Sequence, residues 1–520
     1  MTWNDVVYLL PEIILSIGAS LLLIAPVIGR RREETSAKLA MIALLVITAI
    51  SLIICSHAVE SVGQTRGFGA MFALDGFSIF FKLLFIAAIA MVTLLSDDFL
   101  HETRYSAWEY YSLLAFALTG MMFMASGVHL ITIYIGLELM SLSSYILAGY
   151  FKNEVKSTEA AMKYFILGAV SSGILLYGIS LIYGVCGSMN LNDIARAMST
   201  MITNDALMFG IMLLGAGLCF KIAAVPFHVW TPDVYEGAPT PVSAFLSTAS
   251  KTAAFSIFAR IFYVGLHDFA LDWNNVLAVI SALSMILGNL AAITQNNVKR
   301  MLAYSSIAHA GYIMIGIIAM NAYGIYGVLF YSIVYLFANL GIWSTVLMMR
   351  RHEYAGEQVD DFEGLSRRAP FWAFAMVMFL LSLGGIPPTA GFVGKYFLFA
   401  AAVQSGFGWL AIIAVLMSAV SMFYYLRLVV AMYLKEGAEA EVAMTPALKT
   451  VAGISLAVTL LFGVLPTPLI HMVEQSAASM VKRVVVVNPG SVHPERSEGS
   501  TVPRREPPVV QKTSVVTGAQ

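Results

Sequence analysis

Charged side chains are scarce in this sequence, and their scarcity excludes whole classes of function. Only 12% of the 520 residues are charged and 59% are hydrophobic, whereas a soluble domain has about 25% charged residues. With a mean hydropathy of +0.80, this composition predicts an integral membrane protein that lies in the lipid bilayer. The formal net charge is −1 and the basic residues form no long stripe, so we expect no nucleic-acid partner.

Cysteine is also rare, and its spacing excludes the common metal and redox sites. Cys55, Cys186 and Cys219 stand singly in apolar runs without a CxxC pair or a nearby histidine, so we interpret them as packing residues. Neither a GxGxxG fingerprint nor a P-loop is present. The sequence therefore predicts no metal, no bound cofactor and no redox centre in this chain. Asp5 stands where a secretory signal has basic residues, so we expect the first helix to be retained.

Long apolar runs are what the sequence has in abundance. Runs of about 20 residues, long enough to span a bilayer, start near positions 6, 38, 73, 108, 128, 158, 206, 240, 271, 300, 324, 370, 408 and 446. They predict an all-α polytopic membrane protein with about fourteen transmembrane helices. An even number of spans puts both termini on the same side of the membrane.

The distribution of basic residues selects that side. The connections that follow odd-numbered helices hold Arg30, Arg31, Arg32, Lys38, Lys152, Lys156, Lys299, Arg300, Arg350, Arg351, Arg367 and Arg368. Those after even-numbered helices offer little beyond Arg66 and Arg196. The positive-inside rule therefore places the odd loops in the cytoplasm and both termini on the periplasmic side.

Two apolar runs are interrupted in their middle, one at Pro226 and one at Gly384-Gly385-Ile386-Pro387-Pro388. Because five helices separate the interruptions and five is odd, a five-helix unit would occur twice in opposite orientations. The alternative is two unrelated prolines. Broken helices at membrane depth also indicate an internal wet path.

This interpretation divides the chain into five parts. We expect helices 1–3 in residues 1–105, a first inverted repeat of helices 4–8 in 106–265, and a second of helices 9–13 in 266–436. Helix 14 follows in 437–482. From 483 to 520 the composition shifts to Pro, Ser, Glu, Arg and Val without a helical period, which predicts a disordered tail.

Five ionisable residues lie near the middle of predicted spans: Glu138, Lys221, Lys251, His309 and Lys395. A charged Lys or acid at a helix centre costs at least about 2.5–3.5 kcal/mol on insertion scales. Lys221 and Lys251 have no acid at helical spacing on their own helices. Since lysines outnumber acids at this depth, at least one is unpaired, and a desolvated ammonium exchanges its proton readily. The pattern predicts a proton relay, against the alternative of structural ion pairs.

Other polar residues in the spans favour plainer interpretations. His228, just after Pro226, either bridges the relay or caps the broken helix. Five further charged residues stand toward helix ends, where they can extend to the interface, and we interpret them as anchors: Glu12, Lys82, Lys163, Arg260 and Arg427. The many Met and aromatic residues are interpreted as core and lipid-facing side chains.

Three segments carry a resemblance to a known family. They are Gly136 to Tyr145 (GLELMSLSSY), Phe220 to Val242 (FKIAAVPFHVWTPDVYEGAPTPV) and Ser305 to His309 (SSIAH). They resemble the antiporter-like membrane subunits of respiratory complex I, the bacterial NADH-quinone oxidoreductase. The likeness runs from helix 1 to helix 14 and leaves only the tail unmatched.

The resemblance implies a fourteen-helix bundle with two inverted five-helix repeats and a role in proton translocation. It implies that Glu138 and Lys221 interact in the first half-channel, that Lys251 and His309 carry protons across the middle, and that Lys395 serves the external half. The N-type subunits match best, because the M type has Glu at the position of Lys395. The L type has a long lateral helix after its bundle, whereas the tail here is short, polar and proline-rich.

The resemblance also implies a setting. We expect a multi-pass protein of the bacterial inner membrane, partnered by the other membrane and peripheral subunits, which hold the NADH, FMN, iron–sulfur and quinone sites. The chain would act as part of that enzyme without chemistry of its own. Two alternatives remain: a subunit of a multi-subunit Mrp-type sodium/proton antiporter, and a purely structural membrane subunit.

The topology can be tested at Ser366, which precedes Arg367 and Arg368 in a loop that we expect in the cytoplasm. A Ser366→Cys variant, with the three native cysteines replaced by serine, should react with a membrane-impermeant maleimide only after the cells are opened. Labelling from the outside of intact cells would show that the orientation is inverted.

Overall fold

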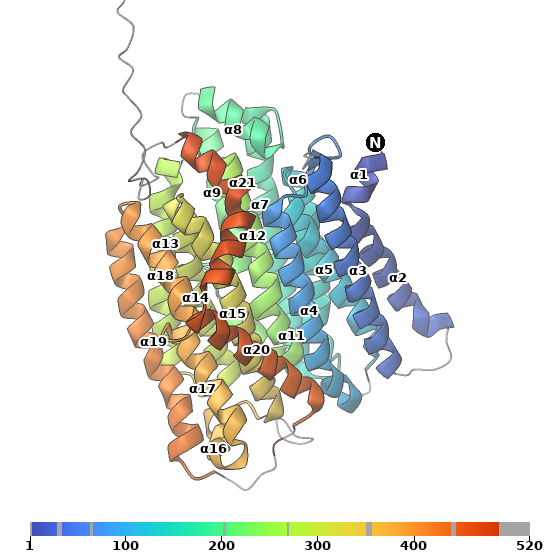
Figure 1. Ribbon diagram of the computed structural model, residues 1–520, viewed down its shortest axis with the longest axis vertical. Coiled ribbons are helices and arrows are strands. Elements are labelled where there is room, and N and C mark those ends of the chain that lie inside the picture. Colours follow the sequence, from blue (N-terminus) through green and yellow to red (C-terminus); the bar gives the residue numbers. More distant parts are fainter. Residues whose placement is uncertain are drawn as a thin grey trace, which may run out of the picture.

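The computed structural model is a bundle of long helices that run roughly side by side (Figure 1). It describes residues 3–487 except 29–33, 63–65, 104, 201–203, 268–269, 350–355, 438–441 and 443. The predicted tail lies outside the described residues from position 488 onward, as do Arg30, Arg31, Arg32, Arg350 and Arg351 of the basic loops.

The N-terminal part forms three long helices and a small hairpin. Its elements are α1 (Trp3–Tyr8), α2 (Leu10–Ile28), α3 (Glu34–Val62), β1 (Arg66–Gly67), β2 (Phe72–Ala73) and α4 (Gly76–Thr103). The two strands pair antiparallel. The backbone N–H of Phe68 in their turn donates a hydrogen bond to Asp5 at 2.9 Å, which ties the hairpin to the N-terminal helix.

The middle of the chain follows with α5 (Ala107–Ser126), α6 (Leu130–Ala148), α7 (Val155–Cys186), the short α8 (Leu191–Thr200), α9 (Asp205–Ile222), α10 (Trp230–Gly237), α11 (Thr240–Phe245), η1 (Leu246–Ser250), α12 (Lys251–Arg260) and η2 (Ile261–Gly265). The last four are continuous and make one crossing. In that crossing the π-helical turns η1 and η2 lie on either side of α12.

The remaining elements are α13 (Ala270–Ile293), α14 (Val298–Ala319), α15 (Ala322–Met348), η4 (Val359–Phe362), α16 (Leu365–Arg368), α17 (Pro370–Gly384), α18 (Ala390–Gln404), α19 (Gly408–Leu434), α20 (Pro446–Val464) and α21 (Thr467–Val487). Eleven of the described helices are long and apolar enough to cross a membrane by length and composition. The helix α5, the α11–η2 segment and the pair α17–α18 complete fourteen crossings, which confirms the predicted number.

The first predicted interruption separates α9 from α10. The helix α9 ends at Ile222, and Ala223 takes a left-handed conformation with φ of 61°. The peptide bond between Val225 and Pro226 is cis. Because proline has no N–H to donate, the helical ladder cannot continue through it, and the chain resumes as a helix only at Trp230.

The second predicted interruption separates α17 from α18. Gly385 has φ of 82°, a conformation that glycine adopts without steric cost, and the Pro387–Pro388 bond is cis. A third interruption, which the sequence analysis did not predict, divides the last crossing into α20 and α21 around Pro466. The predicted single helix 14 is therefore two helices.

Matching contacts occur in the two predicted repeats. The helix α5 packs along α6, and a Cβ atom added at Gly120 would lie 2.6 Å from the backbone nitrogen of Met140. The helix α13 packs along α14 in the same way, with 2.6 Å between an added Cβ at Gly288 and the nitrogen of Ala308. Only glycine permits helices to approach so closely.

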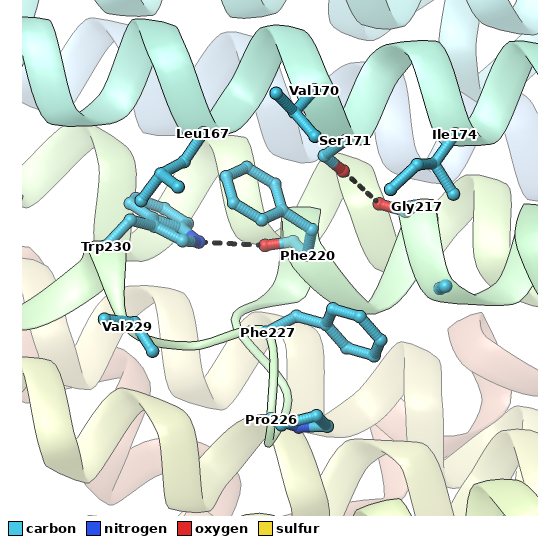
Figure 2. A pocket seen from close by; sticks show the side chains of 11 residues that line it. Leu167, Val170, Ser171, Ile174, Gly217, Phe220, Pro226, Phe227, Val229 and Trp230 are labelled. Atoms are coloured by element: carbon cyan, nitrogen blue, oxygen red, sulfur yellow. Dashed lines mark hydrogen bonds between the residues drawn. The ribbon is translucent and has the colours of Figure 1, made fainter.

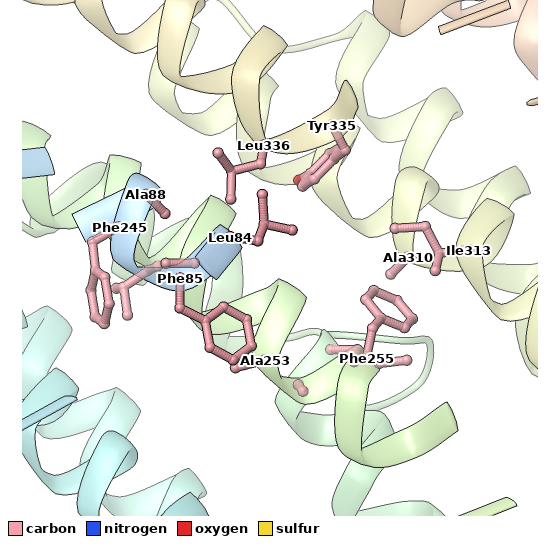
Figure 3. Packing of buried hydrophobic residues seen from close by; sticks show 14 of the residues in the cluster. Leu84, Phe85, Ala88, Phe245, Ala253, Phe255, Ala310, Ile313, Tyr335 and Leu336 are labelled. Carbon is pink, nitrogen blue, oxygen red and sulfur yellow. The ribbon is translucent and has the colours of Figure 1, made fainter. Parts of the chain in front are cut away.

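The apolar core lies where both repeats meet the N-terminal helices. Figure 3 shows Leu84 and Phe85 of α4 packed near Phe255 of α12, Ile313 of α14 and Leu336 of α15. The helices α14 and α15 are almost wholly buried, at 94% and 89% of their spanning windows. Polar side chains on these two helices are therefore shielded from lipid.

Two predicted interfacial anchors, Glu12 of α2 and Lys82 of α4, pair with each other inside the protein. Their side chains are 1% and 0% exposed, and Oε1 of Glu12 lies 2.6 Å from Nζ of Lys82. The prediction that they extend to the interface is wrong, because each finds its counter-charge on a neighbouring helix.

The same correction applies to Arg260 of α12. Its Nη1 and Nη2 donate to the two carboxylate oxygens of Asp75 at 3.0 and 2.8 Å, and its side chain is 2% exposed. The other two predicted anchors, Lys163 and Arg427, are only partly buried, which is compatible with an interfacial position.

The Glu12–Lys82 pair gives a prediction for stability. Lys82→Met leaves a buried carboxylate without its counter-charge and should destabilise the fold by about 3–5 kcal/mol, whereas the double variant Glu12→Gln/Lys82→Met should recover most of that loss. Thermal unfolding of the protein in its native assembly measures both. Equal destabilisation by the single and double variants would contradict a paired role.

Candidate functional site

Lys221 lies in the last turn of α9, just before the first interruption. Its side chain is 5% exposed, and Nζ donates to Ser141 Oγ at 2.8 Å and to Tyr145 Oη at 3.2 Å, both on α6. The carbonyl end of a helix carries a partial negative charge that favours a cation in its last turn. The break therefore supplies part of the electrostatic environment that holds this lysine.

Glu138 of α6 is half-buried, and Ser172 of α7 donates its hydroxyl to Oε1. Among the described residues the carboxylate forms no ion pair with Lys221; instead, hydroxyl groups bind each of the two side chains. The sequence-predicted pair is thus close enough to interact electrostatically without direct contact.

Lys251 begins α12 immediately after the π-helical turn η1, a local widening often found at functional sites. Its side chain is 2% exposed. Nζ donates to both the carbonyl oxygen and the hydroxyl of Ser306 on α14, each at 2.9 Å. A first-repeat lysine is therefore held by a second-repeat helix.

Buried tyrosines pack beside the Lys221 site. The ring of Tyr164 lies 4.6 Å from that of Tyr145 and 4.4 Å from that of Trp230 on α10, between centroids. Because a phenol both donates and accepts a hydrogen bond, Tyr145, which binds Lys221, can pass a proton.

His309 of α14 occupies the centre of the bundle and is 1% exposed. Its Nδ1 lies 2.8 Å from the hydroxyl of Tyr331, and its Nε2 lies 3.2 Å from that of Tyr425. His309 therefore has a tyrosine hydroxyl within hydrogen-bonding distance of each ring nitrogen.

Lys395 of α18 lies beyond the second interruption and is 3% exposed. Its Nζ donates to the carbonyl oxygen of Gly384, the last residue of α17, at 3.1 Å and to Ser418 Oγ at 2.5 Å. It also lies 4.5 Å above the centroid of the Tyr312 ring, a favourable cation–π geometry. At this site a helix carbonyl end faces the ammonium.

The described residues provide no carboxylate within ion-pairing distance of Lys221, Lys251 or Lys395. His228 stands apart from them. It is half-buried in the first interruption, and its Nδ1 is buried without a hydrogen-bond partner among the described residues.

Cavities adjoin both interruptions. One of about 710 Å³ lies between α18 and α19 and includes Lys395, Gly385 and Ser418 in its wall, although most of its lining is apolar. Another of about 210 Å³ lies beside the first interruption (Figure 2), lined by apolar residues such as Phe227 and Trp230. Lys221 does not line it.

The sequence analysis missed the tyrosines, which it had interpreted as core and lipid-facing side chains. Tyr145 hydrogen-bonds Lys221, and Tyr331 and Tyr425 hydrogen-bond His309. The sequence offered no signal for Tyr331 and Tyr425, because they lie on α15 and α19 and only the packing brings them to His309 on α14. Within the described part of the chain, the three cysteines are free thiols, and no cluster of His, Cys, Asp or Glu has a metal-binding arrangement.

Comparisons with known proteins agree with this architecture. The family profile described as NADH:quinone oxidoreductase/Mrp antiporter, TM, matches residues 127–421. NADH-quinone oxidoreductase subunit N of Parvibaculum lavamentivorans is 45% identical over 462 residues, covering 89% of this chain and 95% of its own. The protein of the same name from Trichlorobacter lovleyi is 42% identical and covers 90% of this chain and 96% of its own.

Solved structures give the same result. A chain of respiratory complex I from Thermus thermophilus, solved with bound aureothin, has a TM-score of 0.74 at 32% identity and covers 89% of this chain and 98% of its own. A chain of the Mrp complex from Dietzia sp. has a TM-score of 0.81 at 21% identity and covers 94% of this chain and 99% of its own, which shows a shared fold.

Proposed function

Because the chain belongs to the NADH:quinone oxidoreductase/Mrp antiporter transmembrane family, we propose that it is the N-type proton-translocating membrane subunit of a bacterial NADH-quinone oxidoreductase. One observation carries the proposal: three lysines and a histidine are buried at mid-depth, bound by hydroxyls and helix carbonyls instead of carboxylates. Cations held in this way can release protons.

The relay consists of Glu138, Lys221, Lys251, His309 and Lys395. A change of charge at Glu138 alters the field at Lys221, which passes its proton toward Lys251. His309 then transfers protons between Lys251 and Lys395. Lys395 releases them on the outer side.

Energy for this transport comes from elsewhere. Moving one elementary charge against a membrane potential costs about 2.3 kcal/mol per 100 mV. We assign the driving force to quinone reduction in partner subunits, which hold the NADH, FMN and iron–sulfur sites. The chain therefore contributes to the enzyme as its proton pathway, and its own residues perform no redox step.

The described basic residues support an orientation in the bacterial inner membrane. The helix α16, whose last turn holds Arg367 and Arg368, lies at the end of the bundle opposite the N-terminus (Figure 1), so we place that end in the cytoplasm and the termini in the periplasm. We further propose residues 106–265 and 266–436 as the two inverted repeats, each with one broken helix.

A sodium/proton antiporter subunit is the second candidate, favoured by the fold shared with the Mrp complex. Sodium is a hard cation that requires several oxygen ligands. The described surroundings of Glu138 offer only the Ser172 hydroxyl to its carboxylate, which is a poor set. Flavin and iron–sulfur subunits that co-purify with the chain would support the oxidoreductase, and their absence beside Mrp-type partners would support the antiporter.

The first half of the relay can be tested at Lys221 and Glu138. Lys221→Ala and Glu138→Gln should each lower proton pumping and the coupled quinone reduction on the order of tenfold or more, because each removes a group that exchanges protons. Vesicles containing the assembled complex measure both rates. Lys449→Ala, which alters an exposed lysine, is the control. Normal pumping by an assembled Lys221→Ala complex would refute the relay.

The outer half can be tested at Lys395. A relay lysine must lose its proton in every cycle, whereas a guanidinium stays charged at any physiological pH. Lys395→Arg should therefore assemble but pump poorly, like Lys395→Ala. The measurement is the number of protons moved per NADH oxidised in reconstituted vesicles. Wild-type stoichiometry for Lys395→Arg would show that Lys395 acts only as a fixed positive charge.

A further inference from the structure

A single buried amide joins three helices of the second repeat. Asn289 lies on α13 and is 0% exposed. Its Nδ2 donates to the carbonyl oxygen of Met285, one turn earlier, at 2.7 Å and to the hydroxyl of Tyr312 on α14 at 3.2 Å. Its Oδ1 accepts a hydrogen bond from the hydroxyl of Tyr424 on α19 at 3.1 Å. The amide thus uses both of its N–H donors and its oxygen.

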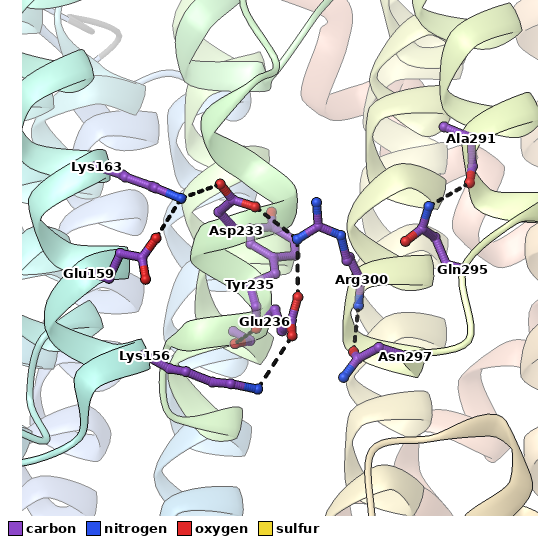
Figure 4. Close-up of polar contacts among 11 residues, drawn as sticks. Lys156, Glu159, Lys163, Asp233, Tyr235, Glu236, Ala291, Gln295, Asn297 and Arg300 are labelled. Carbon is purple, nitrogen blue, oxygen red and sulfur yellow. Dashed lines mark hydrogen bonds and ion pairs between the residues drawn. The ribbon is translucent and has the colours of Figure 1, made fainter.

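Other side-chain amides near the junction of α13 and α14 make local hydrogen bonds. Gln295 donates to the carbonyl oxygen of Ala291 at 3.1 Å, and Asn297 accepts from the backbone N–H of Arg300 at 3.0 Å (Figure 4). Such bonds satisfy backbone groups at helix ends. Asn289 differs from them because it lies inside a helix and binds two tyrosines on two other helices.

Asn289 can reach Tyr312 because α13 and α14 approach closely at this point. Gly288, the preceding residue on α13, makes the close contact with α14 described above. Gly311, which precedes Tyr312, accepts a hydrogen bond from Ser281 of α13 at 2.7 Å through its carbonyl oxygen. The backbone on both sides of the Asn289–Tyr312 hydrogen bond is therefore held by packing between the helices, so the bond fixes the position of the Tyr312 hydroxyl.

The ring of Tyr312 is the surface on which Lys395 rests. Nζ of Lys395 lies 4.5 Å above the ring centroid, and Tyr312 is 1% exposed. A cation–π contact stabilises the cation more strongly in a desolvated place than at an exposed one. The ring can turn about its side-chain torsions unless its far end is held, and Asn289 holds that end.

The helices packed against α18 present mainly tyrosines to this region. Their buried titratable side chains are His309 and Tyr312 of α14, Tyr331 and Tyr335 of α15, and Tyr424 and Tyr425 of α19. The helix α17 has no titratable residue, α20 has only the exposed Lys449, and α18 itself adds the exposed Tyr396. Among these side-chain types only histidine ordinarily titrates near neutral pH, on the acid side of a pH profile.

We propose that Asn289 is a positioning residue for Lys395: by binding the hydroxyl of Tyr312, it keeps the ring face against the ammonium. This contact then sets the pH range over which Lys395 carries its proton. The inference rests on the relay proposed above. Asn289 itself exchanges no proton, and its effect on pumping acts through the ring of Tyr312.

The pH profile of proton pumping by the assembled complex in vesicles tests this role. Asn289→Leu keeps the approximate size of the side chain and removes its hydrogen bonds. The alkaline limb of the profile should move to lower pH by about one pH unit, because the ammonium loses one desolvated cation–π contact. Asn339→Leu on α15 is the matched control. Asn339 is 3% exposed and donates to the carbonyl oxygen of Tyr335, one turn earlier, at 2.8 Å, and this variant should keep the wild-type profile.

Two further variants separate positioning from a general loss of packing. Tyr312→Leu removes the ring and should move the alkaline limb at least as far as Asn289→Leu. The double variant should move it no further than Tyr312→Leu alone, since Asn289 acts through that ring. If Asn289→Leu does not assemble, Tyr312→Phe replaces it, because this variant keeps the ring but removes the hydroxyl that Asn289 binds; its limb should also move to lower pH.

A wild-type profile for an assembled Asn289→Leu or Tyr312→Phe complex would overturn the positioning role, as would a double variant whose shift equals the sum of the two single shifts. Lys395→Ala distinguishes this failure from a failure of the relay. Loss of pumping in Lys395→Ala together with a wild-type profile for Asn289→Leu would reject only the role of Asn289, whereas normal pumping by Lys395→Ala would reject both proposals.

Discussion

The carbonyl ends of two broken helices hold lysines in the middle of the membrane, and the rest of the pathway depends on this arrangement. Lys221 lies in the last turn of α9, and Lys395 donates to the last carbonyl of α17. A helix end carries about half an elementary charge. At an effective dielectric constant near 20 a full counter-charge 4 Å away contributes about 4 kcal/mol, so a helix end contributes about half as much. The ammonium is stabilised but remains able to deprotonate.

The ion pairs that lie outside the proposed relay show buried cations that are held by a full carboxylate and cannot readily release a proton. Lys82 is bound to the full carboxylate of Glu12, and Arg260 is bound twice to Asp75. Deprotonating Lys82 would leave a buried carboxylate without its counter-charge, and a guanidinium does not deprotonate at all. These residues therefore fasten α4 to α2 and α12, while the lysines at the helix breaks remain available for exchange.

The two breaks and the burial of the five ionisable residues proposed for the relay could be anticipated from the sequence because their signals are local. Pro226 and the Gly384–Pro388 segment disrupt a helix wherever it packs, and a lysine in an apolar run is conspicuous by itself. The Glu12–Lys82 pair was not predictable, because its two residues lie on different helices and only the packing brings them together. Tyrosine gave no signal either, since it is equally common in cores and at lipid interfaces.

The third break, at Pro466, shows a further limit. Its Pro-Thr-Pro segment can end a helix as well as bend one, and only the packing of α20 and α21 against α15 makes them parts of one crossing. Local chemistry thus located the helix ends, whereas the assignment of helices to crossings required tertiary contacts.

The proposed repeats also give a reason why the proposed relay crosses from one half of the chain to the other. The close contact of Gly120 with Met140 on α6 matches that of Gly288 with Ala308 on α14. Glu138 lies two residues before Met140, and Ser306 lies two residues before Ala308. Ser306 is therefore the counterpart of Glu138. Lys251 reaches across to Ser306. A carboxylate at that position would pair with Lys251 and retain its proton, whereas a serine hydroxyl donates and accepts without a charge. The substitution of serine for glutamate between the repeats therefore preserves exchange at the point where the two halves join.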